Sequence, residues 1–178
     1  MTDPMSSSLP LVWDRFVRIF HWTLVLCVVS NFFVFDDGKD VHQCTGYLAV
    51  SLVVMRIIWG FVGTQHARFS DFFPTPSRLI RHIKALKSGV YEEHAGHNPL
   101  GALMMLTLIS VVLCLGVTGW MQTLDAYWGE EWLQDTHAFI ADVLIAFAFV
   151  HALAAILMGC LERTRLIRAM FTGRKERW

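Results

Sequence analysis

Four long apolar runs, separated by polar stretches, dominate the pattern of hydrophobic and polar positions along this 178-residue chain. A helix needs about 20 apolar residues to cross a bilayer core, where its backbone polar groups must bond within the segment. The pattern therefore predicts an all-α integral membrane protein, a four-helix bundle in a single domain (residues 1–178). We expect the helices at residues 16–35, 41–62, 99–121 and 136–161.

The polar stretch between the second and third runs contains a shorter pattern at residues 77–88. Basic residues recur there at every third position, interleaved with aliphatic ones: Arg78, Arg81, Lys84 and Lys87. This spacing is typical of an amphipathic helix that lies on a membrane surface. A basic tail, residues 162–178, closes the chain.

Composition and charge agree with this interpretation and indicate on which side of the membrane the termini lie. The chain is 54% hydrophobic and only 17% charged, against about 25% charged residues in soluble domains. Thirteen of its 15 basic residues lie in the N-terminal region, the middle polar stretch and the tail, whereas the two short connections hold seven acidic residues and Lys39. By the positive-inside rule, both termini should be cytoplasmic in a bacterial inner membrane.

Four histidines lie within or at the ends of the apolar runs: His21, His42, His137 and His151. An imidazole inside a membrane needs a partner, because hydrocarbon offers no water to its ring nitrogens. His137 and His151 are 14 residues apart on one helix, which leaves an angular offset of about 40° and a rise of about 21 Å. The predicted topology then places His42 level with His137 near the outer face, and His21 level with His151 nearer the cytoplasm.

Two histidines at one depth, with no cysteine or carboxylate beside them, suit a six-coordinate haem iron whose other four ligands come from the porphyrin. Zinc would need four ligands at each site. The chain has no CxxCH motif for covalent haem attachment. We therefore expect two non-covalent b-type haems with these four histidines as axial ligands. Isolated histidines bonded to helix carbonyls are the alternative.

Arg56 lies 14 residues after His42, on nearly the same helix face and about one haem spacing deeper. A buried arginine needs a counter-charge, and the propionates of the inner haem would supply one. The alternative is an arginine whose side chain reaches the cytoplasmic interface.

The sequence also predicts the surroundings of the other ionisable residues. Asp142 points away from the haem face, and we expect it to bond to a neighbour near the interface; a proton relay near a quinone is the alternative. The remaining histidines fall in the middle polar stretch, where we expect solvated side chains: His66, His82, His94 and His97.

Over nearly its whole length the chain resembles the bacterial cytochrome b561 family, which also contains the b-type cytochrome subunits of nickel–iron hydrogenases. Besides the pair His137 and His151, the resemblance is carried by VWDRFVRIFHW (12–22), VHQCTGYLAV (41–50), MRIIWGFVGTQHARFSDF (55–72), GHNPLGALM (96–104) and RAMFTGRKER (168–177). The GFVG…ARFxDF and GHNPLGA runs look most like its short, stand-alone "cytochrome b/b6 domain" members.

The resemblance implies a bundle with two b haems that moves electrons between quinones and a partner. It maps the family's ligands onto the same four histidines and its propionate-binding arginines onto Arg56. The stretch LQDTHAFIADVL departs from many relatives, which carry a glutamate beside the first histidine. That departure leaves the local charge around the outer haem open.

These features favour a transmembrane electron carrier between the quinone pool and a periplasmic partner. Since both axial positions are filled, the irons should not readily bind oxygen or substrate. Acidic outer connections should attract a basic protein surface, so a c-type cytochrome is the expected partner. We expect no nucleic-acid partner.

Three alternatives stay open. A superoxide:quinone oxidoreductase would be an enzyme, but its anionic substrate would be slowed by an acidic face. A membrane-anchor cytochrome b subunit of a larger oxidoreductase would co-purify with a metalloenzyme. A haem-free bundle would have no Soret band.

Overall fold

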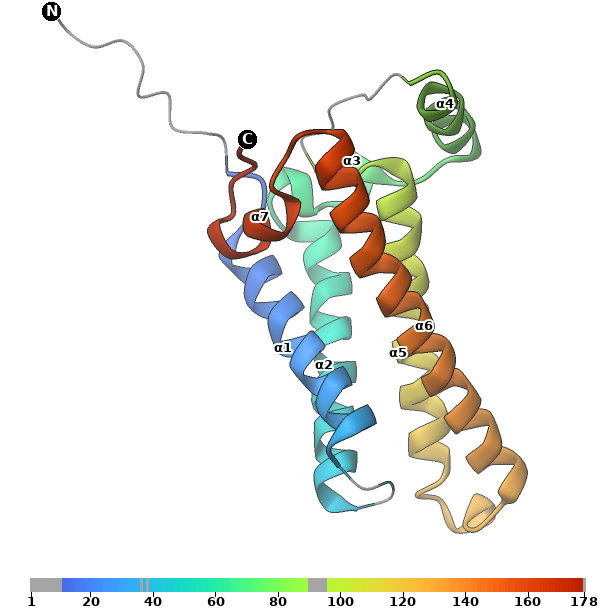
Figure 1. Cartoon of the computed structure of the whole chain (residues 1–178). Coiled ribbons are helices and arrows are strands. Elements are labelled where there is room, and N and C mark those ends of the chain that lie inside the picture. The colour runs from blue at the N-terminus through green and yellow to red at the C-terminus, as the bar shows by residue number, and fades with distance from the viewer. Residues whose placement is uncertain (1–10, 36, 38, 90–95, 178) are drawn as a thin grey trace, which may run out of the picture.

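Four long helices form the body of the protein, described by a computed structural model over residues 11–35, 37, 39–89 and 96–177. They are α1 (Arg15–Phe33), α2 (Asp40–Val62), α5 (Pro99–Met121) and α6 (Glu131–Leu161). All four are long and apolar enough to cross a membrane. Figure 1 shows them side by side, with the α1–α2 and α5–α6 connections at the same end. The predicted all-α four-helix membrane bundle is confirmed.

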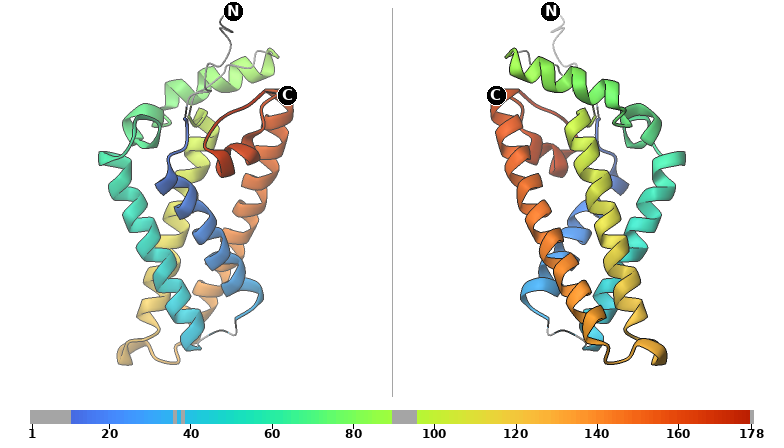
Figure 2. Two further views of the ribbon diagram at one scale, coloured as in Figure 1. Left: turned by 90° about the vertical axis from the view of Figure 1, so that its left-hand side faces the viewer. Right: turned by 90° about the vertical axis from the view of Figure 1, so that its right-hand side faces the viewer.

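Shorter elements gather at the opposite end of the bundle. They are η1 (Gln65–Ala67), α3 (Phe69–Phe72), α4 (Pro76–Lys87) and α7 (Leu166–Thr172), while η2 (Asp125–Tyr127) lies in the α5–α6 connection. Figure 2 shows α4 crosswise over the end of the bundle. We call this the capped end, formed by residues 11–14, 63–89, 96–98 and 162–177, and the other the connection end.

The helix bounds differ from expectation mainly in α6 and α7. Helix α6 begins at Glu131 rather than at residue 136, and the tail contains α7, which we did not expect. Polar residues at a membrane surface can continue a helix beyond its apolar stretch, so an apolar pattern underestimates the helix.

Side chains from all four long helices form the main core of the bundle. Its buried members are Phe20, Cys27, Ala49, Leu52, Val53, Ile109, Val112 and Leu144. A Cβ atom at Gly116 would collide with the side chain of Val50, so this glycine allows α2 and α5 to approach closely.

Asp14 ties the start of α1 to the end of α2. Its carboxylate caps α1 by accepting from the Val17 amide at 2.8 Å, and it also accepts from Trp59 Nε1 at 2.9 Å and Thr64 Oγ1 at 2.6 Å. Burial disfavours the charged carboxylate, but these hydrogen bonds and the positive charge of Arg56 outweigh burial and lower the pKa of Asp14. Asp14 is therefore a buried anion satisfied by three segments.

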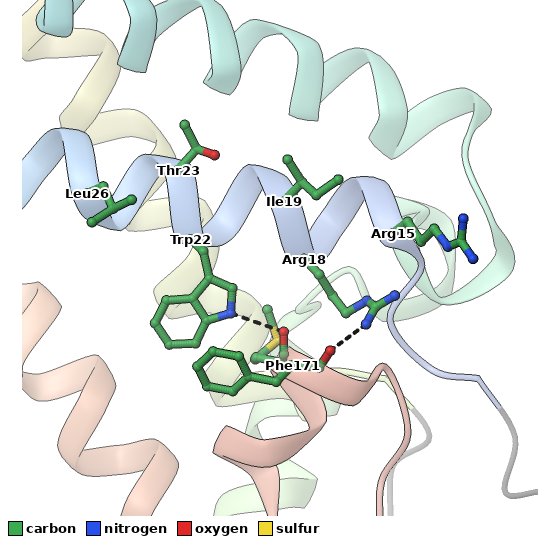
Figure 3. A pocket seen from close by; sticks show the side chains of 8 residues that line it. Arg15, Arg18, Ile19, Trp22, Thr23, Leu26 and Phe171 are labelled. Atoms are coloured by element: carbon green, nitrogen blue, oxygen red, sulfur yellow. Dashed lines mark hydrogen bonds between the residues drawn. The ribbon is translucent and has the colours of Figure 1, made fainter.

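The tail folds back onto α1. The Arg18 guanidinium donates to the Phe171 carbonyl, and Trp22 Nε1 donates to the Met170 carbonyl at 3.1 Å, as Figure 3 shows. The rings of Trp22 and Phe171 stack with centroids 4.3 Å apart. The carbonyl of Gly173 accepts from the backbone ahead of α1. These contacts make the tail a structural part of the capped end.

Replacing Asp14 with alanine should remove the cap and leave Trp59 and Thr64 without their acceptor. We expect a loss of about 2–3 kcal/mol in the free energy of unfolding, measured by denaturant titration in detergent at neutral pH. The exposed Asp125→Ala control should change it by less than about 0.5 kcal/mol.

The pH dependence should follow the lowered pKa of Asp14. Its contribution is complete above the ordinary aspartate pKa of about 4 and disappears as pH falls through the lower folded value. The difference between wild type and Asp14→Ala should therefore shrink in acid; a difference that is constant with pH would contradict a charged Asp14.

Candidate metal centres

The bundle brings the four membrane histidines together as two facing pairs. His42 on α2 and His137 on α6 form the outer pair, nearer the connection end, with ring centroids 6.4 Å apart. His21 on α1 and His151 on α6 form the inner pair, nearer the capped end, with centroids 6.5 Å apart. Because α6 contributes one ring to each pair, its helical repeat fixes the two depths.

Both separations suit one metal ion between two rings. An imidazole nitrogen lies about 2.0–2.1 Å from a metal such as zinc, and the ring centre lies about 1 Å farther, so two opposed rings have centres about 6 Å apart. Within the described ranges, no group of three or more His, Cys, Asp or Glu residues could hold a metal ion. Each pair therefore offers two axial ligands, which is the donor set of a bis-histidine haem.

His137 is held in one orientation by α5. The Thr118 hydroxyl donates to the Cys114 carbonyl at 3.0 Å and lies 2.8 Å from His137 Nδ1, so it is positioned to accept the Nδ1 proton. That arrangement leaves Nε2 available as a metal ligand, as second-shell hydrogen bonds do in metalloproteins. A Cβ atom at Gly119 would lie only 3.3 Å from the His137 ring, so the glycine makes room for it.

Buried nitrogen atoms without a protein partner also mark these pairs. The Nδ1 atoms of His21 and His42 are buried and make no hydrogen bond among the described residues, although His42 Nδ1 lies 3.8 Å from Asp37 Oδ1. Asn31 donates to the His42 carbonyl at 3.1 Å. Buried polar atoms are normally satisfied, but each pair contains an imidazole nitrogen for which the described residues supply no hydrogen bond.

Arg56 is buried in α2 and only 1% exposed. Its Nη2 atom contacts Met105 Sδ at 3.8 Å, and its guanidinium carbon lies 5.5 Å from the centre of the Phe69 ring. Its Nη1 atom has no hydrogen-bond partner in the described part of the chain. The Arg56 guanidinium is therefore enclosed by protein and lies against a residue of the capped end, with one donor unsatisfied; its binding to a propionate stays a prediction.

We expected the histidines of the middle polar stretch to be solvated, but two of them are not. His82 is buried, and the half-buried His97 has ring centroids 4.6 Å from Trp13 and 5.0 Å from Phe72. The expectation failed because distant segments cover both side chains at the capped end. His66 is half-buried, with Nδ1 3.1 Å from an oxygen of Asp71, while His94 lies outside the described residues.

Asp142 also differs from expectation. Its side chain is exposed on α6, and it makes no hydrogen bond or ion pair with any residue that the structure describes. The expected bond to a neighbour is therefore wrong, because the helix turns this carboxylate outward from the bundle.

A family model described as prokaryotic cytochrome b561 matches residues 12–173. The chain belongs to the prokaryotic cytochrome b561 family. It is a multi-pass protein of the bacterial inner membrane and a b-type cytochrome of electron transfer. No solved structure matches this b561 protein significantly.

Curated relatives of this b561 protein carry the name probable Ni/Fe-hydrogenase B-type cytochrome subunit. The relative from Rhizobium leguminosarum bv. viciae is 23% identical, over 92% of this chain and 87% of its own length. The relative from Azotobacter vinelandii is 24% identical, over 91% and 86%. The relative from Bradyrhizobium diazoefficiens is 22% identical, over 93% and 85%.

Sequence reasoning missed several residues around the two pairs. Thr118 carried a detectable signal, since it is a hydroxyl in an apolar run at the predicted depth of the outer pair. Asp14 and His97 carried no comparable signal, because their partners are distant in sequence and belong to polar segments without periodicity.

Proposed function

We propose that this b561 protein carries electrons across the membrane between the quinone pool and a periplasmic partner. The observation that supports this most directly is the pair of facing histidine sets, 6.4 and 6.5 Å between ring centres, at two depths of one bundle. His42 and His137 would hold one b-type haem, and His21 and His151 the other. When bound, each haem supplies reversible one-electron chemistry at an iron whose axial positions are filled by protein.

The chain's own residues define the spacing and surroundings of the two sites. His137 and His151 are 14 residues apart on α6, a rise of about 21 Å along the helix. Thr118 orients the His137 ring, and the buried charge of Arg56 would stabilise an anionic propionate of the inner haem.

The connection end would face the periplasm, as the charge distribution favours. Its described acidic residues are exposed: Asp37, Asp40, Asp125, Glu130, Glu131 and Asp135. An anionic surface increases the rate at which a cationic protein arrives, so a basic c-type cytochrome would suit this end.

The names of the relatives support a second candidate function. Those proteins are named as hydrogenase B-type cytochrome subunits, so this chain would be the membrane anchor of a larger oxidoreductase. Purification of the tagged chain from its native membrane under mild detergent distinguishes the two. A stoichiometric metalloenzyme in the purified sample would favour the anchor, and a chain purified without one would favour the stand-alone carrier.

Replacing His42 with alanine should remove one axial ligand of the outer haem and spare the inner one. We expect haem content to fall from two to one per chain, measured by pyridine haemochrome and reduced-minus-oxidised spectra of the detergent-purified protein. The His66→Ala control should keep both haems. A variant that retains two would overturn the pairing, and a haem-free wild type would overturn the proposed function.

Replacing Thr118 with valine should remove the hydrogen bond that orients His137. We expect about tenfold weaker retention of the outer haem, since loss of a partner to a ligating histidine typically costs about 10–100-fold in affinity. The readout is the rate of haem transfer to an excess of apomyoglobin. Thr107→Val is the matched control, because that hydroxyl bonds only within α5, to Leu103 at 3.0 Å; equal rates would exclude an orienting role.

Raising the ionic strength should slow reduction of the protein by a cationic c-type cytochrome. At about 0.5 M salt the Debye length falls well below its value of roughly 10 Å at 0.1 M, so steering by the acidic connections weakens. Stopped-flow rates should fall by tenfold or more, and a Glu130→Gln, Glu131→Gln variant should show a shallower salt dependence. A salt-independent rate would contradict an acidic docking face.

A further inference from the structure

A second group of unsatisfied polar atoms lies at the capped end of the bundle. His97 is its centre: the ring lies between Trp13 and Phe72, at 4.6 and 5.0 Å between ring centroids. Its Nδ1 atom is buried and has no hydrogen-bond partner in the described part of the chain. The aromatic rings hold this imidazole in place but supply no hydrogen-bond partner for Nδ1. The ring contacts therefore explain where His97 lies, but not why a polar atom is buried there.

Ring contacts link His97 to Arg56. The Arg56 guanidinium lies over the Phe69 ring, Phe69 contacts Phe72 at 5.8 Å between ring centroids, and Phe72 contacts His97. Arg56 and His97 thus contact the same pair of neighbouring aromatic rings, Phe69 and Phe72. Burial lowers the pKa of His97 to about 3, and the charges of Arg56 and Lys175, together with the rings of His151 and His21, add to this effect. At neutral pH the imidazole is therefore uncharged, with one N–H group to donate.

Arg56 provides the second unsatisfied donor. Its one hydrogen bond in the described ranges is the weak contact with Met105 Sδ, although a guanidinium has five N–H groups. The charge of Arg56 acts on Asp14, but no hydrogen bond joins the two side chains in the described part of the chain, and Asp14 accepts from Val17, Trp59 and Thr64 instead. Two buried donors, one of them cationic, therefore share a region that supplies too few acceptors.

The tail holds the backbone next to His97. Lys175 Nζ donates to the Gly96 carbonyl at 2.9 Å, and the charge of Glu162 also acts on Lys175. The tail itself is fixed to α1 through Trp22 and Met170. Lys175 is therefore placed to position the 96–98 segment against the bundle.

We propose that His97 is a second donor, beside Arg56, to the carboxylate groups of the inner haem, and that Lys175 positions it through Gly96. This inference rests on the proposed function, in which His21 and His151 hold that haem. Haem b carries two propionates, and an anionic carboxylate inside a protein needs hydrogen-bond donors to offset its lost hydration. His97 and Arg56 are two buried residues at this end of the bundle whose polar atoms the described residues leave unsatisfied.

The first test is a redox titration of the full-length holoprotein in detergent. In His97→Leu the propionate charge is less compensated, which favours the ferric haem. We expect the midpoint potential of the inner haem to fall while that of the outer haem stays constant. His97→Gln keeps a donor and should restore most of the potential, Lys175→Met should lower it less, and the His66→Ala control should leave it unchanged.

The second test asks whether the bound anion is the propionate or another group, such as a lipid phosphate. The His42→Ala background leaves only the inner pair, and its haem can be extracted and replaced by haem or by haem dimethyl ester, whose propionates carry no charge. We expect the ester to bind about tenfold more weakly than haem or worse. The added His97→Leu substitution should reduce that preference.

The outcomes separate the two proposals. A wild-type protein without an inner haem would overturn the proposed function. With the inner haem present, an unchanged potential in His97→Leu would overturn the role of His97. If His97→Leu fails to retain the haem, ester binding decides: equal affinity for haem and its ester in the His42→Ala protein rejects carboxylate recognition, and a preference for haem supports it.

Discussion

A bilayer core contains no water, so a polar side chain that a long helix turns into the bundle needs a partner inside the protein or in a bound group. This constraint organises the bundle. The hydroxyl groups of Ser51, Thr107 and Ser110 bond to carbonyls of their own helices. Buried atoms of His21, His42 and Arg56 have no such partner among the described residues, and the fold brings the four histidines together as two pairs. In the proposed function, bound haem would supply partners for the metal-facing imidazole nitrogens and for Arg56.

The two ends of the molecule differ in how far they expose their polar side chains. At the connection end, short acidic loops cover little of the bundle and leave their carboxylates exposed. At the capped end, helices α3, α4 and α7 enclose side chains that a simple bundle would expose to water, including His82 and His97. The acidic end suits contact with another protein, whereas the enclosed end suits retention of a buried anion.

Much of this arrangement could be predicted from the sequence. The apolar runs defined the spanning helices because a bilayer sets a minimum length, and a 14-residue spacing on one helix fixed the relative depth of His137 and His151. The capped end could not be predicted in the same way. Trp59 and Thr64 meet Asp14 across about 50 positions of sequence, and Lys175 meets Gly96 across still more. Such contacts follow from how helices and loops pack, and periodicity carries no information about them.

The bond from Lys175 to the backbone of Gly96 also has a consequence for biogenesis. A ribosome releases residues 170–175 only after all four spanning helices have been made. The segments that close the capped end around His97 therefore come together only after α6 has been made, whereas both histidine pairs need nothing beyond α6. Closure of the capped end is accordingly a late step in the maturation of this protein, and a substitution of Lys175 acts directly on that step.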